Sequence, residues 1–166
     1  MTMFAFSKLW KIIKRLRAPG GCEWDRAQTI ETLKPFLLEE AHEAAEAIGK
    51  KDPKGICEEL GDLMLEVLLV TRLCEEKEWF TLKDVLRGIS DKLVRRHPHV
   101  FGKLRTTDPK EIIQNWEKIK KQEKGTTHGD LVRGIPVTMP ALARAYKVQD
   151  RVAGVGFDWE DVRGVL

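Results

Sequence analysis

The sequence predicts an all-α protein, a compact helical bundle built from short helices. Apolar residues recur three and four positions apart in several successive segments, and proline and glycine residues separate these segments. No segment shows the apolar and polar alternation that is typical of a strand. The chain has 166 residues, of which 42% are apolar and 33% are charged, so it is long enough to bury a core and too apolar to be disordered.

Five helices are expected ahead of a glycine- and proline-rich linker. The first should end at the Pro-Gly-Gly run of 19–21, and a short loop is expected at 22–25. Thr29 or Thr32 can begin the second helix, and its continuous part should start at Pro35, because proline is tolerated only in the first turn. The expected ranges are 7–17, 35–48, 54–77, 82–96 and 108–123.

The helix expected at 54–77 is the most apolar segment of the chain. Between Leu60 and Leu73 it carries apolar residues on nearly every side, which is typical of a helix at the centre of a bundle or in a subunit interface. The other short helices can hardly enclose it completely. We therefore expect a homodimer or a higher homo-oligomer to complete the core.

Two carboxylate motifs lie on this helix and on the one before it. An E-E-x-x-E motif contains Glu40 and Glu43, and an E-x-x-D motif contains Glu59 and Asp62. Residues three apart share a helix face, so each motif can present a pair of carboxylates. One such motif alone is equally well explained by a solvated helix face. Because the second pair lies in the most apolar helix, the two motifs together favour a divalent metal site, and oxygen ligands favour Mg²⁺ or Mn²⁺ over Zn²⁺.

Gly61 and Glu66 are unexpected in so apolar a helix. A glycine inside a helix costs about 1 kcal/mol relative to alanine, so Gly61 indicates that another group approaches the backbone closely. A charged side chain such as Glu66 is costly in this setting unless it is paired or bound to a metal. Helix packing alone therefore explains neither residue.

A basic group follows on the helix expected at 82–96. Lys92, Arg95 and Arg96 lie three and four apart on adjoining parts of one face, where they can hold phosphate oxygens. Alone they are more often a solvated face, but beside a magnesium site the phosphate interpretation is favoured, because Mg²⁺ usually shares its coordination between carboxylates and phosphates. Trp116 is either a core residue or a stacking partner for a base.

Charge, hydropathy and cysteine content argue against several classes of protein. The net charge is +3 and the two signs are mixed along the chain, which argues against nucleic acid as the main partner. No apolar run approaches the ~20 residues that span a bilayer, and the N-terminus lacks the features of a signal peptide, so we expect a cytoplasmic protein without a membrane partner. Cys22, Cys57 and Cys74 form no C-x-x-C pair and are expected to be reduced thiols.

Three regions are expected along the chain: a complete module at 1–124, a linker at 125–140 and the start of a second module at 141–166. The G-C-E-W-D segment at 21–25 lines up with G-F-D-W-E at 156–160, which indicates an internal repeat. The second copy is expected to stop before its own carboxylate motifs.

Several groups of residues resemble the MazG-type nucleoside triphosphate pyrophosphohydrolases. They are the G-C-E-W-D segment with the Q-T that follows it, the two carboxylate motifs, the S-D-K-L-V-R-R-H-P-H-V-F run at 90–101 and the N-W-E-K-I-K run at 115–120. The R-R-H-P-H-V-F block resembles, more narrowly, the N-terminal module of two-module members. The resemblance implies the all-α pyrophosphohydrolase fold and hydrolysis of a nucleoside triphosphate to the monophosphate and pyrophosphate.

The resemblance also implies a role for each candidate residue. Carboxylates would hold Mg²⁺, the basic group would meet the phosphates, and a tryptophan would pack near the base. One further carboxylate would either orient the attacking water or support the metal ligands from behind. The implied metal ligands are Glu40, Glu43, Glu59 and Asp62. The implied phosphate-binding residues are Lys92, Arg95 and Arg96, Trp116 is the tryptophan near the base, and Glu39 is the further carboxylate. Phosphate-directed groups outnumber groups suited to reading a base, so broad base tolerance is expected. The alternative is a non-catalytic module that binds nucleotide or drives oligomerisation for a second module.

Overall fold

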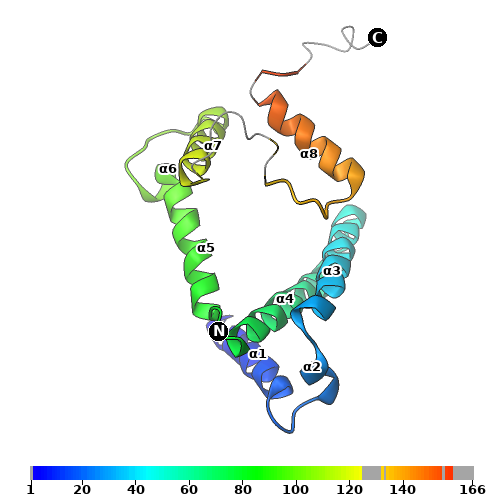
Figure 1. Cartoon of the computed structure of the whole chain (residues 1–166). Coiled ribbons are helices and arrows are strands. Elements are labelled where there is room, and N and C mark those ends of the chain that lie inside the picture. Colours follow the sequence, from blue (N-terminus) through cyan, green and yellow to red (C-terminus); the bar gives the residue numbers. More distant parts are fainter. Residues whose placement is uncertain (1, 125–131, 133, 155, 159–166) are drawn as a thin grey trace. The chain divides into compact units, whose positions relative to one another are not determined.

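The computed structural model of the chain describes residues 2–124, 132, 134–154 and 156–158, and all regular secondary structure in these ranges is helical (Figure 1). The predicted all-α class is therefore confirmed. None of the described helices combines the length and the apolar character needed to cross a lipid bilayer. The helices are α1 (Thr2–Arg17), α2 (Glu23–Ala27), α3 (Ile30–Lys50), α4 (Pro53–Glu76), α5 (Leu82–Arg96), α6 (Pro98–Phe101), α7 (Pro109–Lys124) and α8 (Ala141–Ala153).

Helix α3 begins five residues before the start expected at Pro35, so that prediction was wrong. The reason is a strong cap at its N-terminus. The Thr29 side chain accepts a hydrogen bond from the Thr32 backbone N–H at 3.2 Å, and the Thr32 hydroxyl accepts one from the Thr29 backbone N–H at 2.8 Å. This reciprocal pair satisfies two N–H groups that a helix end leaves free, so the first turn forms although Pro35 cannot donate a backbone hydrogen bond.

Short helices were missed where a loop or a turn was expected. Helix α2 replaces most of the loop expected at 22–25, and α6 forms directly after the His97-Pro98 step. Helix α1 also starts at Thr2 rather than at Ser7. Helices of four or five residues are too short to show a helical repeat of apolar residues, so their sequence does not separate them from turns.

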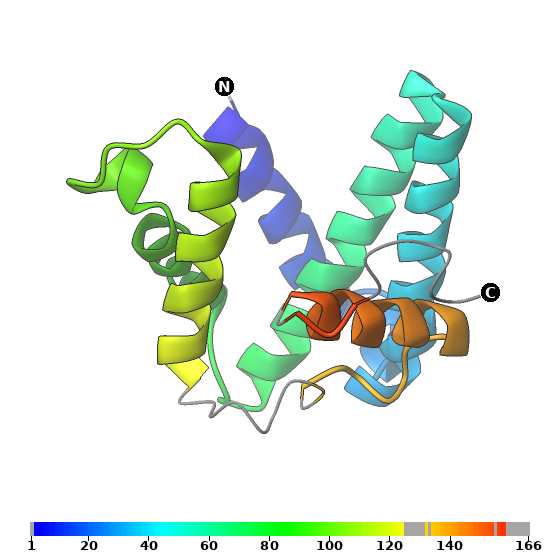
Figure 2. The same ribbon diagram turned by 90° about the horizontal axis from the view of Figure 1, so that it is seen from above.

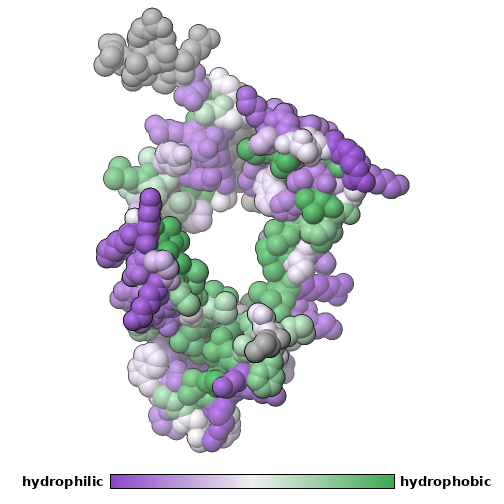
Figure 3. All heavy atoms as spheres, turned by 180° about the vertical axis from the view of Figure 1, so that it is seen from behind, coloured by the Kyte–Doolittle hydropathy of each residue, from purple (hydrophilic) through white to green (hydrophobic). Residues whose placement is uncertain are grey.

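The chain divides into two compact units, residues 1–93 and 94–166, and each is described by itself. In the first unit α3 and α4 lie side by side along their length, and α1 contacts α2 and α4 (Figure 2). Apolar side chains gather where α1, α4 and the start of α5 meet (Figure 3). The buried cluster consists of Ile13, Leu33, Leu68, Leu69, Leu73 and Leu82.

An ion pair fastens the end of α1 to the end of α4. The Arg17 Nη2 atom lies 2.8 Å from Glu76 Oε2, and only 6% of the Arg17 side chain is exposed. Arg17 Nη1 also donates to the backbone carbonyl of Asp25 in α2. A single arginine of α1 therefore contacts both α2 and α4 and links the three helices.

Helix α4 is enclosed by its own chain only along its second half. Leu68, Leu69 and Leu73 are buried, whereas Leu60 and Met64 in the first half are 47% and 46% exposed. The chain itself therefore covers only the C-terminal turns of this apolar helix. The exposed half is the half that carries the second carboxylate motif.

The predicted modules and linker are only partly covered by the described residues. Helix α8 lies in the expected second module, but residues 125–131 and 133 of the linker and residues 155 and 159–166 of that module lie outside the described ranges. The division at 1–124, 125–140 and 141–166 stays a prediction.

Replacing Gly61 by alanine is expected to stabilise the fold by about 0.5–1 kcal/mol, the difference between the two residues inside a helix. A Cβ atom at this position would meet no atom within 4 Å, so the close approach expected at Gly61 is not made by the described chain. The gain is measured as a shift of the urea unfolding midpoint at constant slope.

Gly55→Ala is the matched control on the same helix, because a Cβ there would lie 2.6 Å from the Asp52 Oδ2 atom and the substitution should bring no gain. A loss of stability in Gly61→Ala would contradict the expectation. It would indicate that another molecule, such as a second copy of the chain, approaches this backbone.

Candidate metal and phosphate site

Three carboxylates converge where α3 packs against α4. Glu40 and Glu43 lie one turn apart on α3, and Glu59 lies on α4. One carboxylate oxygen from each of these residues lies within 4.8 Å of the other two. Oxygens at this separation from two adjacent helices can bind one hard divalent cation, which would offset their mutual repulsion.

Asp62, the fourth predicted metal residue, is exposed on α4 and is not one of the three converging carboxylates. It nevertheless lies close enough to act on two of them. Burial and then the charge of Glu43 are the largest causes that raise the pKa of Glu40 and of Glu59, and the charge of Asp62 is the next cause in each case. Asp62 is therefore part of the same negative field, one turn along α4 from Glu59.

This field makes the charged carboxylates unfavourable in the folded chain. Because the pKa values of Glu40 and Glu59 are raised above the ordinary 4.5, their ionisation favours the unfolded state as the pH rises from that value. Binding of a divalent cation would reverse the sign of this effect, since the cation favours the charged form. The residues present therefore fit a metal ion.

Glu66 and Asp25 adjoin these carboxylates, and the sequence assigned neither to the site. The Glu66 Oε2 atom is buried and has no hydrogen-bond partner among the described residues. Burial is the first cause that raises the pKa of Glu66, followed by the charges of Glu40, Asp25 and Asp62. The position of Glu66 could have been predicted from its spacing, because it lies four residues after Asp62 on the same helix face. The spacing of residues gave no indication that α2 brings Asp25 close to Glu66.

Glu39, predicted to orient water, is exposed on α3 beside Glu40. Adjacent helix residues point about 100° apart, so Glu39 points away from Glu40, but its spacing of four residues from Glu43 places these two carboxylates one turn apart on adjoining parts of the helix. Its charge is among the causes that raise the pKa of Glu40. The role of Glu39 stays a prediction.

The predicted phosphate group is divided between the two units. Lys92 is exposed on α5 in the first unit, and Arg95, Arg96 and Trp116 belong to the second. Arg95 Nε donates to Glu123 Oε1 at 2.5 Å, and Arg96 Nε donates to Glu123 Oε2 at 3.0 Å. The Arg96 guanidinium also lies over the Trp116 ring, 5.3 Å from its centre. The structure thus brings Arg95 and Arg96 together around a carboxylate that the sequence analysis did not single out, and Trp116 contacts Arg96.

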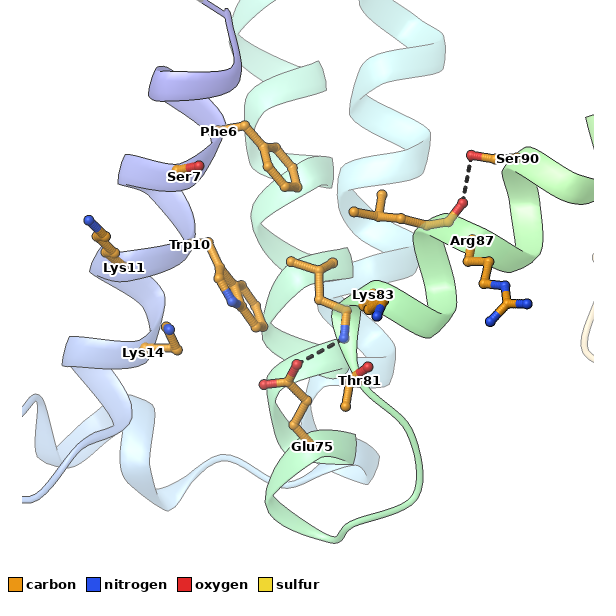
Figure 4. A pocket seen from close by; sticks show the side chains of 12 residues that line it. Phe6, Ser7, Trp10, Lys11, Lys14, Glu75, Thr81, Lys83, Arg87 and Ser90 are labelled. Carbon is orange, nitrogen blue, oxygen red and sulfur yellow. Dashed lines mark hydrogen bonds between the residues drawn. The ribbon is translucent and has the colours of Figure 1, made fainter.

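A separate cavity of about 670 Å³ lies between α1 and α5 in the first unit (Figure 4). Phe6 and Trp10 point into it from α1, and Leu82 and Leu86 line it on α5. Glu75 lines it from α4, where Oε1 accepts a hydrogen bond from the Leu82 backbone N–H at 2.8 Å. No predicted site residue lines this cavity, so it is distinct from the carboxylates on α3 and α4.

Known proteins are similar to this chain over the segment that carries the carboxylate and basic motifs. The model of the MazG nucleotide pyrophosphohydrolase domain matches residues 28–101, a range that contains all the predicted metal residues. The Thermotoga maritima protein named nucleoside triphosphate pyrophosphohydrolase/pyrophosphatase MazG is 45% identical over 160 residues, which are 96% of this chain and 61% of that protein. The Escherichia coli K12 nucleoside triphosphate pyrophosphohydrolase is 41% identical over 99% of this chain and 63% of its own length.

The chain therefore spans about three fifths of these two relatives. It spans 29% of a Bacillus subtilis protein, the uncharacterized YabN, to which it is 48% identical. The crystal structure of a mazG-related protein from Thermotoga maritima matches with a TM-score of 0.60 and 32% identity, over 69% of this chain and 98% of that one. These matches confirm the resemblance that the motifs carried, and the chain belongs to the MazG nucleotide pyrophosphohydrolase family.

Proposed function

We propose that the chain hydrolyses nucleoside triphosphates to the monophosphate and pyrophosphate, with Mg²⁺ as its metal and Mn²⁺ as a substitute. The observation that carries this proposal is the convergence of Glu40, Glu43 and Glu59 to within 4.8 Å. The names of the relatives from Thermotoga maritima and Escherichia coli support the reaction class. Asp62, one turn from Glu59, is proposed to complete the metal site.

When bound, the metal would neutralise negative charge on the phosphates and favour ionisation of a water molecule. The chain's own residues supply the remaining functions. Glu39 is proposed to accept the proton of the attacking water, and Lys92, Arg95 and Arg96 to hold the triphosphate. Guanidinium groups suit this role because each can donate two parallel hydrogen bonds to a phosphate.

Base recognition is proposed to be loose. Trp116 is half-buried, and its ring already lies edge-on to the His97 ring at 4.8 Å and beneath the Arg96 guanidinium. An aromatic face accepts any base, whereas discrimination by powers of ten requires buried hydrogen-bond partners. The cytoplasm is proposed as the location of the chain, where the thiols of Cys22, Cys57 and Cys74 would stay reduced.

Light scattering at micromolar concentration is expected to give a homodimer or a higher homo-oligomer. Leu60, Met64 and Val67 lie on one face of α4 and are each between 45% and 47% exposed, so a second copy would remove a large apolar patch from water. Met64→Glu should shift the mass toward the monomer, and Met3→Glu, at a position that is 85% exposed on α1, should not. A monomer mass for the parent chain would refute this proposal.

The reaction is tested by incubating the chain with each common nucleoside triphosphate, with Mg²⁺ and separately with a chelator, and by resolving the products. Mg²⁺-dependent release of pyrophosphate from several nucleotides is expected. Saturable nucleotide binding without any product would instead favour the non-catalytic module.

A further inference from the structure

Glu123, in the last turn of α7, binds both arginines of the predicted phosphate group. Its Oε1 atom accepts from Arg95 Nε at 2.5 Å, and its Oε2 atom accepts from Arg96 Nε at 3.0 Å and also from Arg96 Nη2. The two guanidinium groups thus share one carboxylate and use both of its oxygens. This arrangement is the one that a pair of arginines makes with two oxygens of a phosphate.

The surroundings of the two arginines differ. The Arg96 side chain is 12% exposed and is also held over the Trp116 ring, whereas the Arg95 side chain is 52% exposed. The Glu123 side chain is 19% exposed and reaches the pair from α7. Arg96 is therefore fixed by the fold, and Arg95 is free to follow a ligand that replaces Glu123.

Glu123 is ionised under all ordinary conditions. Hydrogen bonds from Arg96 and then from Arg95 lower its pKa from 4.5 to about 2. The carboxylate consequently neutralises one of the two positive charges that a phosphate would otherwise meet. A triphosphate carries several charges and can outcompete a single carboxylate, but it must then displace that carboxylate.

We propose that Glu123 occupies the phosphate position of the Arg95–Arg96 pair and acts as an internal competitor that sets the affinity for polyphosphate ligands. The inference rests on the proposed role of these arginines in holding the triphosphate. It adds Glu123 to the phosphate site and predicts that removal of this carboxylate strengthens the binding of polyphosphate.

The test is calorimetric titration of the full chain with inorganic tripolyphosphate, a ligand that has no base and needs no catalysis. Glu123→Gln is expected to bind tripolyphosphate about three- to tenfold more tightly than the parent, the range of a partly exposed ion pair. Glu117→Gln is the matched control, because Glu117 lies on the same helix and pairs with Lys120 at 2.8 Å. It should bind like the parent. Glu123→Asp keeps the charge and should show no gain of the size seen with glutamine.

Equal or weaker tripolyphosphate binding by Glu123→Gln, with the helical content of the parent retained, would overturn the inference and would make Glu123 a support for the arginines. Arg95→Ala should weaken tripolyphosphate binding, and the absence of that effect would also overturn it. The proposed reaction is judged separately by Mg²⁺-dependent hydrolysis in the parent chain. With nucleotide as substrate, Glu123→Gln should lower KM by the same factor.

Discussion

Replacing Glu59 by glutamine is expected to lower kcat/KM for nucleoside triphosphates by on the order of a hundredfold or more, because it removes one of the three converging carboxylates. The fold should survive. Burial and the charge of Glu43 raise the pKa of Glu59, so its ionised form opposes folding at neutral pH when no metal is bound. In the presence of a chelator, the variant should therefore unfold at a urea concentration equal to or above that of the parent.

Glu58→Gln is the matched control for this prediction. Glu58 precedes Glu59 on α4 and contributes to the raised pKa of Glu59, but it is not one of the converging carboxylates. This variant should keep its activity. Full hydrolysis by Glu59→Gln would contradict the assignment of the metal site.

Replacing Arg95 by alanine should raise KM by a similar factor, about tenfold, for every nucleoside triphosphate, as expected for loss of a charged hydrogen-bond donor to phosphate. The parent chain should hydrolyse several nucleotides with kcat/KM values within about a hundredfold of one another, because contacts with an aromatic face discriminate weakly. Steady-state kinetics with a panel of nucleotides measures both expectations.

Arg87→Ala is the control, since Arg87 lies on the same helix, is 75% exposed and pairs with Asp91 at 3.6 Å. It should leave KM unchanged. A preference of about ten-thousandfold for one nucleotide, or an effect of Arg95→Ala on one base alone, would show that the site contains a specific base reader.

Local signals in the sequence predicted most of the helices. Helix α5 begins and ends at the expected residues, Leu82 and Arg96, and Thr29 is the cap of α3. Thr29 was one of two expected starts of α3, but the continuous helix was expected only from Pro35. Helix α2 was missed, because its place depends on the contacts of Arg17 and not on apolar periodicity. Tertiary contacts of this kind leave no periodic trace in the sequence.

The candidate site was predictable where its residues share a helix. The spacing of Glu40 and Glu43 placed them on one face of α3, and the packing of α3 on α4 adds Glu59. The approach of Asp25 and the contact of Glu123 with Arg95 depend on how separate helices meet. Spacing along one helix carries no information about such contacts.

Binding of Mn²⁺, followed by electron paramagnetic resonance in the absence of nucleotide, tests most directly whether the carboxylates on α3 and α4 form a metal site. The parent chain should remove free Mn²⁺ from solution in a saturable manner, Mg²⁺ should compete, and Glu59→Gln should lose most of this binding while Glu58→Gln retains it. Equal Mn²⁺ binding by the parent and by Glu59→Gln would contradict a metal site at Glu40, Glu43 and Glu59.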